Sequence, residues 1–242
     1  MEKKREILKR ENLPKHVAII MDGNRRWAKK QGKKTLLGHR SGVETMLNIV
    51  EESAQLDLDN LTVYAFSTEN WGREKTEVNY LMNLLLEFLK SQIDRLDENN
   101  IKLNFLGNLQ DLPKNIAKKV EDALIRTENN DKMNFNICMS YGSRDEILRA
   151  VKNICLDVKS DEITVDDITK DVFGNYLYTK DIADPDLMIR TSGEIRLSNF
   201  LLYQMAYAEM YFTDVLWPDF TIEEYYKALE EYLRRNRRFG KN

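Results

Sequence analysis

The sequence predicts an α/β fold, a single domain in which helices flank a central, mainly parallel sheet. Short apolar segments alternate with longer segments of helical periodicity, which is typical of parallel sheets with crossover helices. The short segments are almost continuously apolar, as strands buried on both faces are. The chain has ten Gly, four Pro and no stretch of linker composition, so we treat residues 1–242 as one domain with a basic N-terminal extension, 1–13.

Six strands and six helices are expected along the chain. The expected strands are 16–21, 61–66, 101–106, 134–140, 186–190 and 210–215. The expected helices are 42–55, 77–97, 113–127, 144–158, 164–176 and 222–235. Pro113 suits the first turn of its helix, and Thr164 with Asp167 resembles a capping box. In such sheets ligands bind beyond the carboxyl ends of the strands, so candidate site residues are sought there.

Composition excludes several classes of protein. The 242 residues are 42% hydrophobic, with 37 Lys and Arg against 40 Asp and Glu, which is ordinary for a globular protein. No apolar run approaches the roughly 20 residues of a membrane-spanning helix. The basic residues 1–10 are followed by no apolar segment of a secretory signal, so we expect a cytoplasmic protein.

The two cysteines indicate neither a disulfide framework nor a zinc site. Cys138 and Cys155 lie far apart, and neither has a neighbour at zinc-ligand spacing. We interpret both as small buried hydrophobic residues.

Charge is distributed unevenly. Residues 1–40 contain thirteen Lys and Arg against four acids, and residues 231–242 contain five against one. Basic regions of this kind predict an anionic partner, whether a nucleic acid, a membrane surface or a phosphorylated small molecule. Two solvated chain ends would have the same composition.

The first expected strand leads into residues suited to a phosphate and a cation. Asp22 and Gly23 follow it directly, and Arg25 and Arg26 add positive charge suited to phosphate oxygens. If a helix starts near Asn24, its free N–H groups add to an anion site. A carboxylate beside a phosphate is repulsive unless a divalent cation bridges them, which is how Mg²⁺ often binds. The alternative is that Asp22 or Asn24 merely caps a helix.

Two further strand ends are rich in polar groups. Residues 67–73 hold hydroxyl, carboxylate, amide, indole and guanidinium groups, although Ser67 and Thr68 could be turn residues and Trp71 a core aromatic. After 186–190, Arg190 and Arg196 with two serines form a plausible second anion site or a surface turn.

Two isolated residues complete the set of candidates. Glu209 is an acid in an apolar, aromatic run, which is costly unless it is paired or metal-bound. It is therefore a candidate second carboxylate for the cation. His39, beside Arg40, is either structural or a diphosphate contact.

Five segments, at or near the strand ends described above, resemble the cis-prenyltransferases, most of all the bacterial undecaprenyl diphosphate synthases. The matching segments are HVAIIMDGN (16–24), GHRSG (38–42), YAFSTENW (64–71), RTSGEIRLSNFLL (190–202) and YFTDVLWP (211–218). They occur in the family's order and spacing over about residues 14–240.

The resemblance implies a homodimeric α/β fold that is not a Rossmann fold. It implies a Mg²⁺-dependent enzyme that condenses isopentenyl diphosphate repeatedly onto farnesyl diphosphate and forms cis double bonds. The product would be a long-chain, undecaprenyl-like diphosphate, the precursor of a lipid carrier for cell-wall glycan synthesis. Peripheral contact with the inner face of the plasma membrane would then accompany product release.

The resemblance also implies roles for residues. Asp22 matches the metal-linked aspartate at the allylic diphosphate, Glu194 and Glu209 match acidic positions near the metal and the dimer contact, and Asn70 matches a helper in proton removal. Arg190, Arg196 and Ser198 match the cradle for isopentenyl diphosphate. The other predicted substrate contacts are Gly23, Asn24, Arg25, Arg26, Trp27, His39, Ser67, Thr68, Glu69, Trp71, Arg73 and Leu197.

Three positions depart from the family pattern. Arg25 stands where many members have Gly, Thr35 where an Arg is common, and Ile195 where a His is frequent. None of them alters Asp22, so we expect an active enzyme.

Other functions fit the sequence less well. A trans-prenyltransferase needs Asp-rich motifs whose spacing residues 166–171 miss. A non-catalytic scaffold subunit should have lost Asp22 or the arginines, and a cis-prenyltransferase of a different product length remains an alternative. We expect no nucleic-acid partner, because the basic run 234–238 lacks interleaved aromatic residues or a known binding module.

A growing prenyl tail must be kept from water, which predicts an apolar tunnel below the diphosphates. Strand alternation places Ala65 on the same face as Ser67, one step below it, where a small side chain leaves room. The helix that follows carries an apolar stripe that could line the tunnel or be an ordinary core face.

Overall fold

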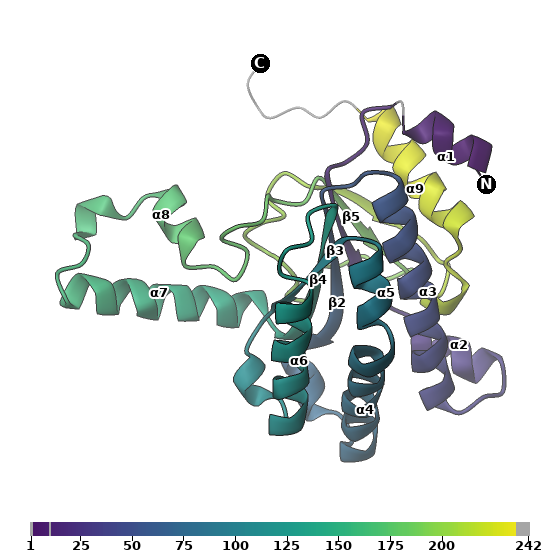
Figure 1. Ribbon diagram of the computed structural model, residues 1–242, viewed down its shortest axis with the longest axis horizontal. Coiled ribbons are helices and arrows are strands. Elements are labelled where there is room, and N and C mark those ends of the chain that lie inside the picture. The colour runs from purple at the N-terminus through teal and green to yellow at the C-terminus, as the bar shows by residue number, and fades with distance from the viewer. Residues whose placement is uncertain (1, 10, 236–242) are drawn as a thin grey trace.

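The computed structural model describes residues 2–9 and 11–235, whose strands form one six-stranded, entirely parallel sheet (Figure 1). The strand order is β3-β4-β2-β1-β5-β6, which differs from the 3-2-1-4-5-6 order of a Rossmann fold. The strands are β1 (His16–Ile20), β2 (Asn60–Ser67), β3 (Ile101–Leu106), β4 (Met133–Tyr141), β5 (Leu187–Arg190) and β6 (Glu209–Phe212). The predicted α/β class and parallel sheet are confirmed, because every strand pair is parallel, and β1 and β5 are buried along their whole length.

The two faces of the sheet are covered differently. Val17, Ile19, Leu61 and Val63 point into the larger core, against helices. These helices are α3 (Thr35–Gln55), α4 (Lys75–Ser91), α5 (Ile93–Glu98), α6 (Lys114–Arg126) and α9 (Ile222–Arg234). The alternate residues Ala18 and Ile20 point into a smaller core closed largely by the 197–208 segment. Helices therefore pack mainly on one face of the sheet (Figure 1).

Several helix boundaries differ from the prediction. The expected helix 77–97 is divided at Gln92 into α4 and α5, although its apolar periodicity continues through the break. The expected helix 164–176 is a short 3-10 helix, Val165–Asp167, followed by α8 (Lys170–Asn175), with the expected Thr164–Asp167 capping box in place. Helix α1 (Glu2–Leu8) lies in the expected N-terminal extension, where no helix was predicted.

Helix α3 begins seven residues earlier than predicted because α2 (Asn24–Lys30) packs closely against it. A Cβ at Gly38 would lie 2.1 Å from the carbonyl oxygen of Asn24, and one at Gly42 would lie 2.4 Å from Asn24 Oδ1. Glycines usually weaken a helix, but here they allow two backbones to approach. This contact fixes α2 directly behind Asp22.

Helix α1 is tied to the body by a buried carboxylate. Arg5 Nε and Nη2 donate to Glu52 on α3 at 2.7 and 2.6 Å, and the Tyr226 hydroxyl of α9 donates to the same carboxylate at 2.5 Å. The first and last helices therefore lie side by side (Figure 1). The expected basic run 234–238 lies mostly outside the described residues.

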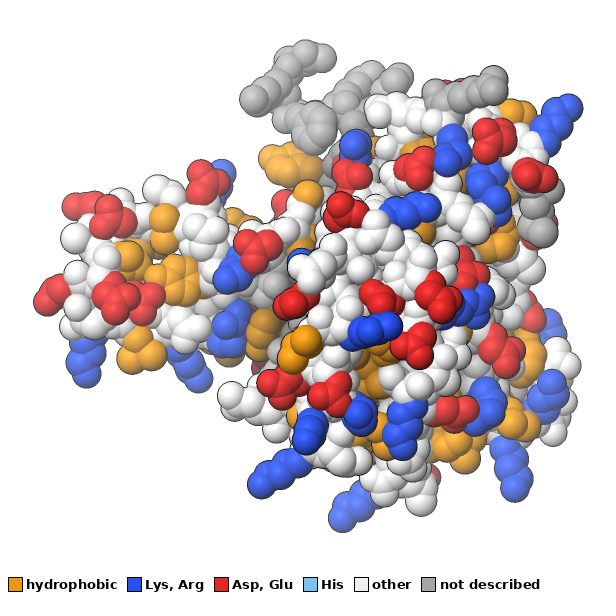
Figure 2. Space-filling view, in the orientation of Figure 1, with side chains coloured by type: hydrophobic (Ala, Val, Ile, Leu, Met, Phe, Trp, Pro, Cys, Tyr) orange, Lys and Arg blue, Asp and Glu red, His pale blue; other side chains and the backbone are white. Residues whose placement is uncertain are grey.

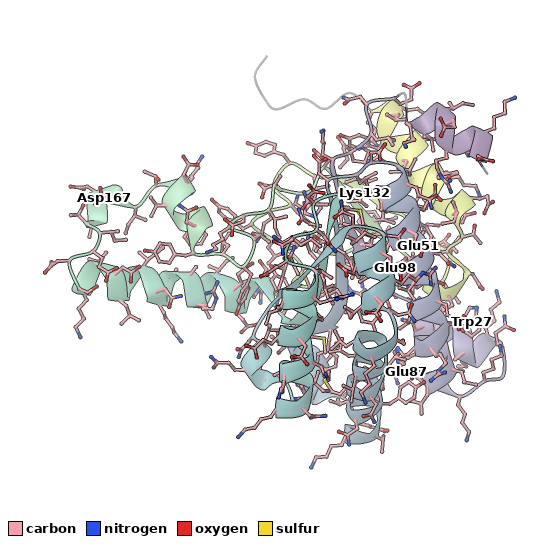
Figure 3. The ribbon with its side chains drawn as sticks, in the orientation of Figure 1. Trp27, Glu51, Glu87, Glu98, Lys132 and Asp167 are labelled. Atoms are coloured by element: carbon pink, nitrogen blue, oxygen red, sulfur yellow. The ribbon has the colours of Figure 1, made fainter. Side chains whose placement is uncertain are left out.

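One helix projects from the rest of the domain. Helix α7 (Ser143–Lys159) begins at the carboxyl edge of the sheet and projects away with α8, forming an arm (Figure 1) whose tip lies near Asp167 (Figure 3). Apolar side chains lie on the surface of this arm (Figure 2), and Leu148, Val151 and Leu156 on α7 are 58%, 44% and 61% exposed.

Two further observations concern the burial of the cysteines and the expected lack of a membrane-spanning helix. Cys138 is buried, as predicted, but Cys155 on the projecting α7 is exposed, so that interpretation of it was wrong. Within the described part of the chain, no helix combines the length and apolar character needed to cross a membrane.

Candidate active site

The carboxyl ends of β1, β2 and β5 meet at a polar cavity of about 800 Å³. Asp22 follows β1, Ser67 ends β2 and Arg190 ends β5, so parallel pairing brings together residues far apart in sequence. The predicted site residues that line this cavity are Asp22, Gly23, Asn24, Arg25, Arg26, His39, Ala65, Ser67, Glu69, Asn70, Arg73, Arg190 and Ser198.

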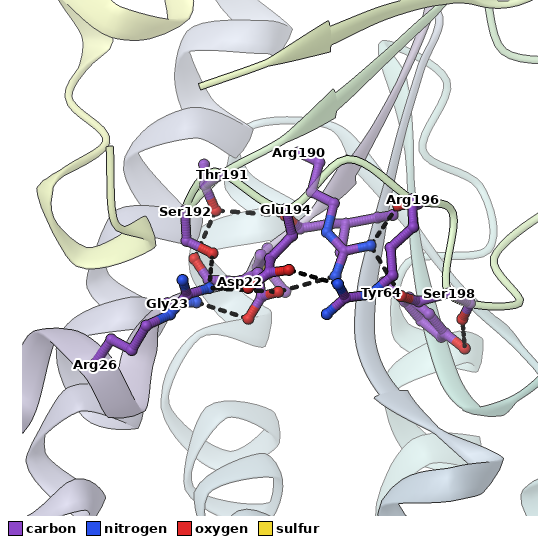
Figure 4. A network of polar contacts seen from close by, with 12 residues as sticks. Asp22, Gly23, Arg26, Tyr64, Arg190, Thr191, Ser192, Glu194, Arg196 and Ser198 are labelled. Carbon is purple, nitrogen blue, oxygen red and sulfur yellow. Dashed lines mark hydrogen bonds and ion pairs between the residues drawn. The ribbon is translucent and has the colours of Figure 1, made fainter. Parts of the chain in front are cut away.

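Asp22 and Arg190 form the centre of this edge (Figure 4). Arg190 is only 3% exposed, and its Nη2 donates to Asp22 Oδ2 at 2.9 Å while its Nη1 donates to Ser198 Oγ at 2.8 Å. The Nη1 group also donates to the carbonyl oxygen of Arg196. Because these bonds fix both ends of the guanidinium, Arg190 is held rigidly beside the carboxylate.

A second, more exposed arginine faces Asp22 from α2. Arg26 Nη2 donates to Ser192 Oγ and lies 3.2 Å from Glu194 Oε1 and 3.9 Å from Asp22 Oδ2. Glu194 also accepts from Arg196 Nη1 at 2.5 Å, so this carboxylate joins two predicted phosphate ligands (Figure 4). Asp22 therefore lies between a buried arginine and an exposed one.

The turn before α2 depends on a glycine. Gly23 adopts φ 114°, in the left-handed region, and its N–H donates to Asp22 Oδ1 at 2.9 Å. Asn24 then begins α2, as anticipated, and no side chain caps this helix. The carboxylate of Asp22 is thus turned into the cavity, and the capping alternative fails for both Asp22 and Asn24.

His39 belongs to a charged cluster that centres on Glu77. The Glu77 carboxylate lies 3.3 Å from His39 Nε2, 3.2 Å from Arg73 Nη1 and 3.9 Å from Arg25 Nη1. Burial lowers the pKa of His39 below its ordinary value, and the neighbouring Glu77 opposes this only in part. The imidazole is therefore neutral near pH 7 and can donate or accept one hydrogen bond on each nitrogen.

The segment after β2 forms a short 3-10 helix, Thr68–Gly72, closed by a reciprocal cap between Ser67 and Asn70. Asn199 Nδ2 donates to Glu69 at 2.9 Å and Thr68 Oγ1 donates to Asp145 at 3.0 Å. Burial alone would raise the pKa of Glu69, but hydrogen bonds, first that from Asn199, lower it on balance. Glu69 is therefore a carboxylate that anchors the segment over the cavity.

Five predicted contacts lie outside the polar cavity, and one of them is the exposed Arg196. Trp27 is buried, with Nε1 donating to Asp219 at 2.6 Å, and Trp71 packs against Phe66 with Nε1 donating to Ser140 Oγ at 2.8 Å. These indoles shape the cavity from behind rather than line it. Thr68 faces Asp145, and Leu197 lines an adjoining hollow.

Glu209 is not near Asp22, so the expectation that the two carboxylates share a cation within one chain is wrong. Glu209 starts β6 and pairs in register with Leu187, at the amino edge of the sheet, whereas Asp22 follows the carboxyl end of β1. Its carboxylate accepts from Arg235 Nη1 at 3.0 Å. The ion pair with Arg235 satisfies the carboxylate that the sequence suggested was metal-bound.

The acidic groups fit a cation only in combination with a substrate. Among residues 2–9 and 11–235, no group of three His, Cys, Asp or Glu could hold a metal ion. Asp22 nevertheless presents one partly exposed carboxylate to the cavity, with arginines on both sides. One carboxylate together with phosphate oxygens is a common Mg²⁺ site, so the donor set fits that ion.

An apolar cavity of about 110 Å³ adjoins the polar one. Asn24, His39, Ala65 and Leu81 line both cavities, and Leu84, Leu85 and Phe88 of α4 line the apolar one. The strand alternation expected around Ala65 is broken, because β2 bulges there against β4. Ala65 is nonetheless exposed to both cavities.

Sequence reasoning missed Arg144, Tyr64 and Glu77. Arg144, in the first turn of α7, lines the polar cavity, and Tyr64 lines it while stacking on Phe200 at 4.5 Å. Glu77 orients His39 and Arg73. Arg144 lies three residues after the end of β4, a position that could have identified it. Tyr64 carries no local signal, and Glu77 carries only its spacing of four residues from Arg73.

The chain is similar to known proteins over nearly its whole length. Residues 20–240 match the model of the undecaprenyl diphosphate synthase family. Isoprenyl transferases of Clostridium perfringens and Geobacter sulfurreducens are each 48% identical, covering 97% and 96% of this chain and 92% and 94% of theirs.

Solved structures are also similar. A lavandulyl diphosphate synthase from Lavandula x intermedia, in complex with dimethylallyl diphosphate, has a TM-score of 0.92 and 37% identity over 95% of this chain and 99% of that one. A probable undecaprenyl diphosphate synthase from Campylobacter jejuni has a TM-score of 0.79 and 34% identity over 95% and 100%.

The fold and the family match are those of the cis-prenyltransferases. The chain belongs to the undecaprenyl diphosphate synthase family.

Proposed function

We propose that the protein condenses isopentenyl diphosphate repeatedly with farnesyl diphosphate to give a long-chain, undecaprenyl-length product with cis double bonds. Such a product would serve as the precursor of the lipid carrier for cell-wall glycans. The observation that carries the proposal is Asp22, held between Arg190 and Arg26 in a polar cavity that adjoins an apolar one. This arrangement suits substrates with a charged head and an apolar tail.

The two arginines divide the cavity into two diphosphate cradles. Arg26, with His39 and the turn at Gly23, would bind the allylic diphosphate, and Arg190, Arg196 and Ser198 would bind isopentenyl diphosphate. Arg190 Nε is buried without a partner among the described residues, so a phosphate oxygen could complete its hydrogen bonding.

Mg²⁺ would be held by Asp22 together with the allylic phosphate oxygens. Its chemistry there is to neutralise charge on the departing diphosphate. Arg26 would add positive charge beside the same leaving group, and Asn70 would orient the isopentenyl unit as its proton is lost. Each condensation breaks one allylic C–O bond, forms one C–C bond and releases one inorganic diphosphate and one proton.

The tail would enter the apolar cavity past Ala65, whose small side chain lies between the two spaces. At about 110 Å³ this cavity is small for a long tail, so elongation would require the α4 side chains to move. A product of shorter or different length is the alternative, and the lavandulyl diphosphate synthase shows that a similar fold occurs with a different named product.

The decisive experiment is incubation with labelled isopentenyl diphosphate, farnesyl diphosphate and Mg²⁺, followed by chromatography of the products. A ladder ending near eleven isoprene units supports the proposal. A single short product supports the alternative, and no product in a folded protein would indicate a scaffold subunit, although Asp22 and the arginines argue for catalysis.

We further propose that the protein is a homodimer that pairs through the arm. The support is the exposed apolar set on α7 and the segment that follows it, Leu148, Val151, Leu156, Val165 and Ile168, which a second copy would cover. Sedimentation should show a dimer that Leu148→Glu with Leu156→Glu converts to a monomer. Lys118→Glu, at an exposed position of α6 away from the arm, is the matched control.

The protein is proposed to act in the cytoplasm and to contact the inner face of the plasma membrane peripherally when product is released. The reason is that a polyprenyl tail partitions from water into lipid. Sedimentation with lipid vesicles should recover more enzyme after turnover than before substrate is added.

A further inference from the structure

A cationic hollow adjoins the catalytic cavity without belonging to it. Between Asp22 and Glu44 the chain carries seven Lys and Arg and no acid. Helix α2 and the turn after it gather five of these cations around a space of about 390 Å³. The hollow is lined by Arg25, Arg26, Lys29, Lys33, Lys34 and Thr35.

The hollow is continuous with the site through its arginines. Arg25 and Arg26 also line the polar cavity. Arg25, Lys34 and Thr35 further line a third space of about 410 Å³ toward Arg73 and Glu77. An anion leaving Arg26 would therefore meet these cations next.

The lysines are available to a ligand. Within residues 2–9 and 11–235, Lys29, Lys33 and Lys34 are exposed and form no ion pair with a carboxylate. The Lys33 ammonium lies over the Trp27 ring, 4.7 Å from its centre. The two arginines reach carboxylates, Arg25 only at 3.9 Å from Glu77. Uncompensated positive charge around a concave space favours a small polyanion.

We propose that this hollow, beside the two cradles, is a further diphosphate site, which receives the inorganic diphosphate released by each condensation. The inference rests on the proposed function. After the C–O bond breaks, inorganic diphosphate lies between Asp22 and Arg26, while the lengthened chain carries its own diphosphate in the Arg190 cradle. The leaving group must vacate the allylic cradle before the chain can enter it for the next condensation. Lys33 and Lys34 would attract the released inorganic diphosphate from the allylic cradle into the hollow.

The test is equilibrium dialysis of labelled inorganic diphosphate with Mg²⁺ and saturating isopentenyl diphosphate, which fills the Arg190 cradle and does not react without an allylic partner. The wild-type chain should bind two diphosphates, and the double variant Lys33→Ala, Lys34→Ala should weaken one of them by about tenfold or more, as loss of two charge-assisted contacts predicts. Lys30→Ala, on α2 outside the hollow, is the matched control and should retain both sites. In turnover assays the double variant should show slower successive condensations with an unchanged first one.

Three results would overturn the inference. One is a single diphosphate per wild-type chain, and another is unchanged binding in the double variant. The third is a double variant that retains both diphosphates but loses binding to phosphatidylglycerol vesicles, which would make the hollow a lipid-headgroup contact. Failure of the proposed function would appear separately, as absence of prenyl products from wild-type protein that still binds diphosphate.

Discussion

The two edges of the sheet differ in how fully their buried polar groups are hydrogen-bonded. At the amino edge His16 contacts the Ala183 carbonyl oxygen at 2.6 Å and Thr62 Oγ1 at 2.7 Å, and Glu209 pairs with Arg235. At the carboxyl edge the described residues leave two buried atoms, Arg190 Nε and Asn24 Oδ1, without partners. A buried polar atom without a partner is costly. The two unpartnered atoms at the carboxyl edge therefore lower stability but are available to a ligand. The polar groups named at the amino edge are all paired.

This difference predicts that changes at the carboxyl edge reduce activity and leave the fold intact, while changes at the amino edge reduce stability and leave activity intact.

The largest effect is expected for Asp22→Ala. Removing the carboxylate between Arg190 and Arg26 should lower turnover by roughly 10²–10³-fold, on the scale of losing a major electrostatic contributor. Steady-state assays measure the loss, and circular dichroism with thermal unfolding checks the fold. Turnover near the wild-type level in a folded variant would remove Asp22 from the site.

The pH dependence of stability tests the amino edge of the sheet. Burial lowers the pKa of His16 from 6.5 to about 4. Between these two pH values His16 is therefore protonated in the unfolded chain and neutral in the folded chain. Unfolding free energy should therefore fall as pH drops from 6.5 to 4, by up to roughly 3 kcal/mol from this group. Urea unfolding across this range should show a smaller decline for His16→Gln, with turnover at pH 7.5 within about twofold of wild type. Equal declines in both proteins would exclude His16 as the source.

Arg190→Ala and Arg196→Ala should chiefly weaken isopentenyl diphosphate. We expect its KM to rise about 10- to 100-fold for the buried Arg190, the scale of a charged hydrogen bond, and less for the 60%-exposed Arg196. Kinetics with each substrate varied in turn decide the assignment. A rise confined to the KM of farnesyl diphosphate would mean that the two cradles are interchanged.

The smallest effect on rate is expected below both cradles. Ala65→Leu should obstruct the passage to the apolar cavity, so that short prenyl diphosphates accumulate while the first condensation survives. Product chromatography measures the distribution, with Ala65→Gly as the small control. An unchanged ladder from the active leucine variant would show that the tail takes another path.

The sequence predicted all six strands in order. Burial on both faces leaves a nearly continuous apolar pattern in strands such as β1, although β6 is only half-buried. The sequence also located most of the cavity, because parallel strands end at one edge. It could not locate the end of α4, where the apolar periodicity continues past the break at Gln92. Nor could it predict the early start of α3, which depends on contact between α2 and two glycines.

Site residues were missed or misplaced where a distant partner decides their role. Glu209 was expected beside a metal because an acid in an apolar run needs compensation, but Arg235, 26 residues away, supplies it. Glu77 was overlooked because only the tertiary fold brings His39, 38 residues away, to it, although Arg73 is a sequence neighbour. Local patterns indicate that a charge must be balanced, and they do not identify the partner.

The strand order has a consequence for how the protein is made on the ribosome. The strand synthesised first, β1, lies between β2 and β5. When residue 141 has emerged, β3, β4, β2 and β1 can already pair, but β1 remains an open edge until residues 187–190 follow. An apolar open edge invites pairing with other chains. The nascent chain is therefore most exposed to aggregation while α7 and α8 are being synthesised, and the arrival of β5 ends that interval.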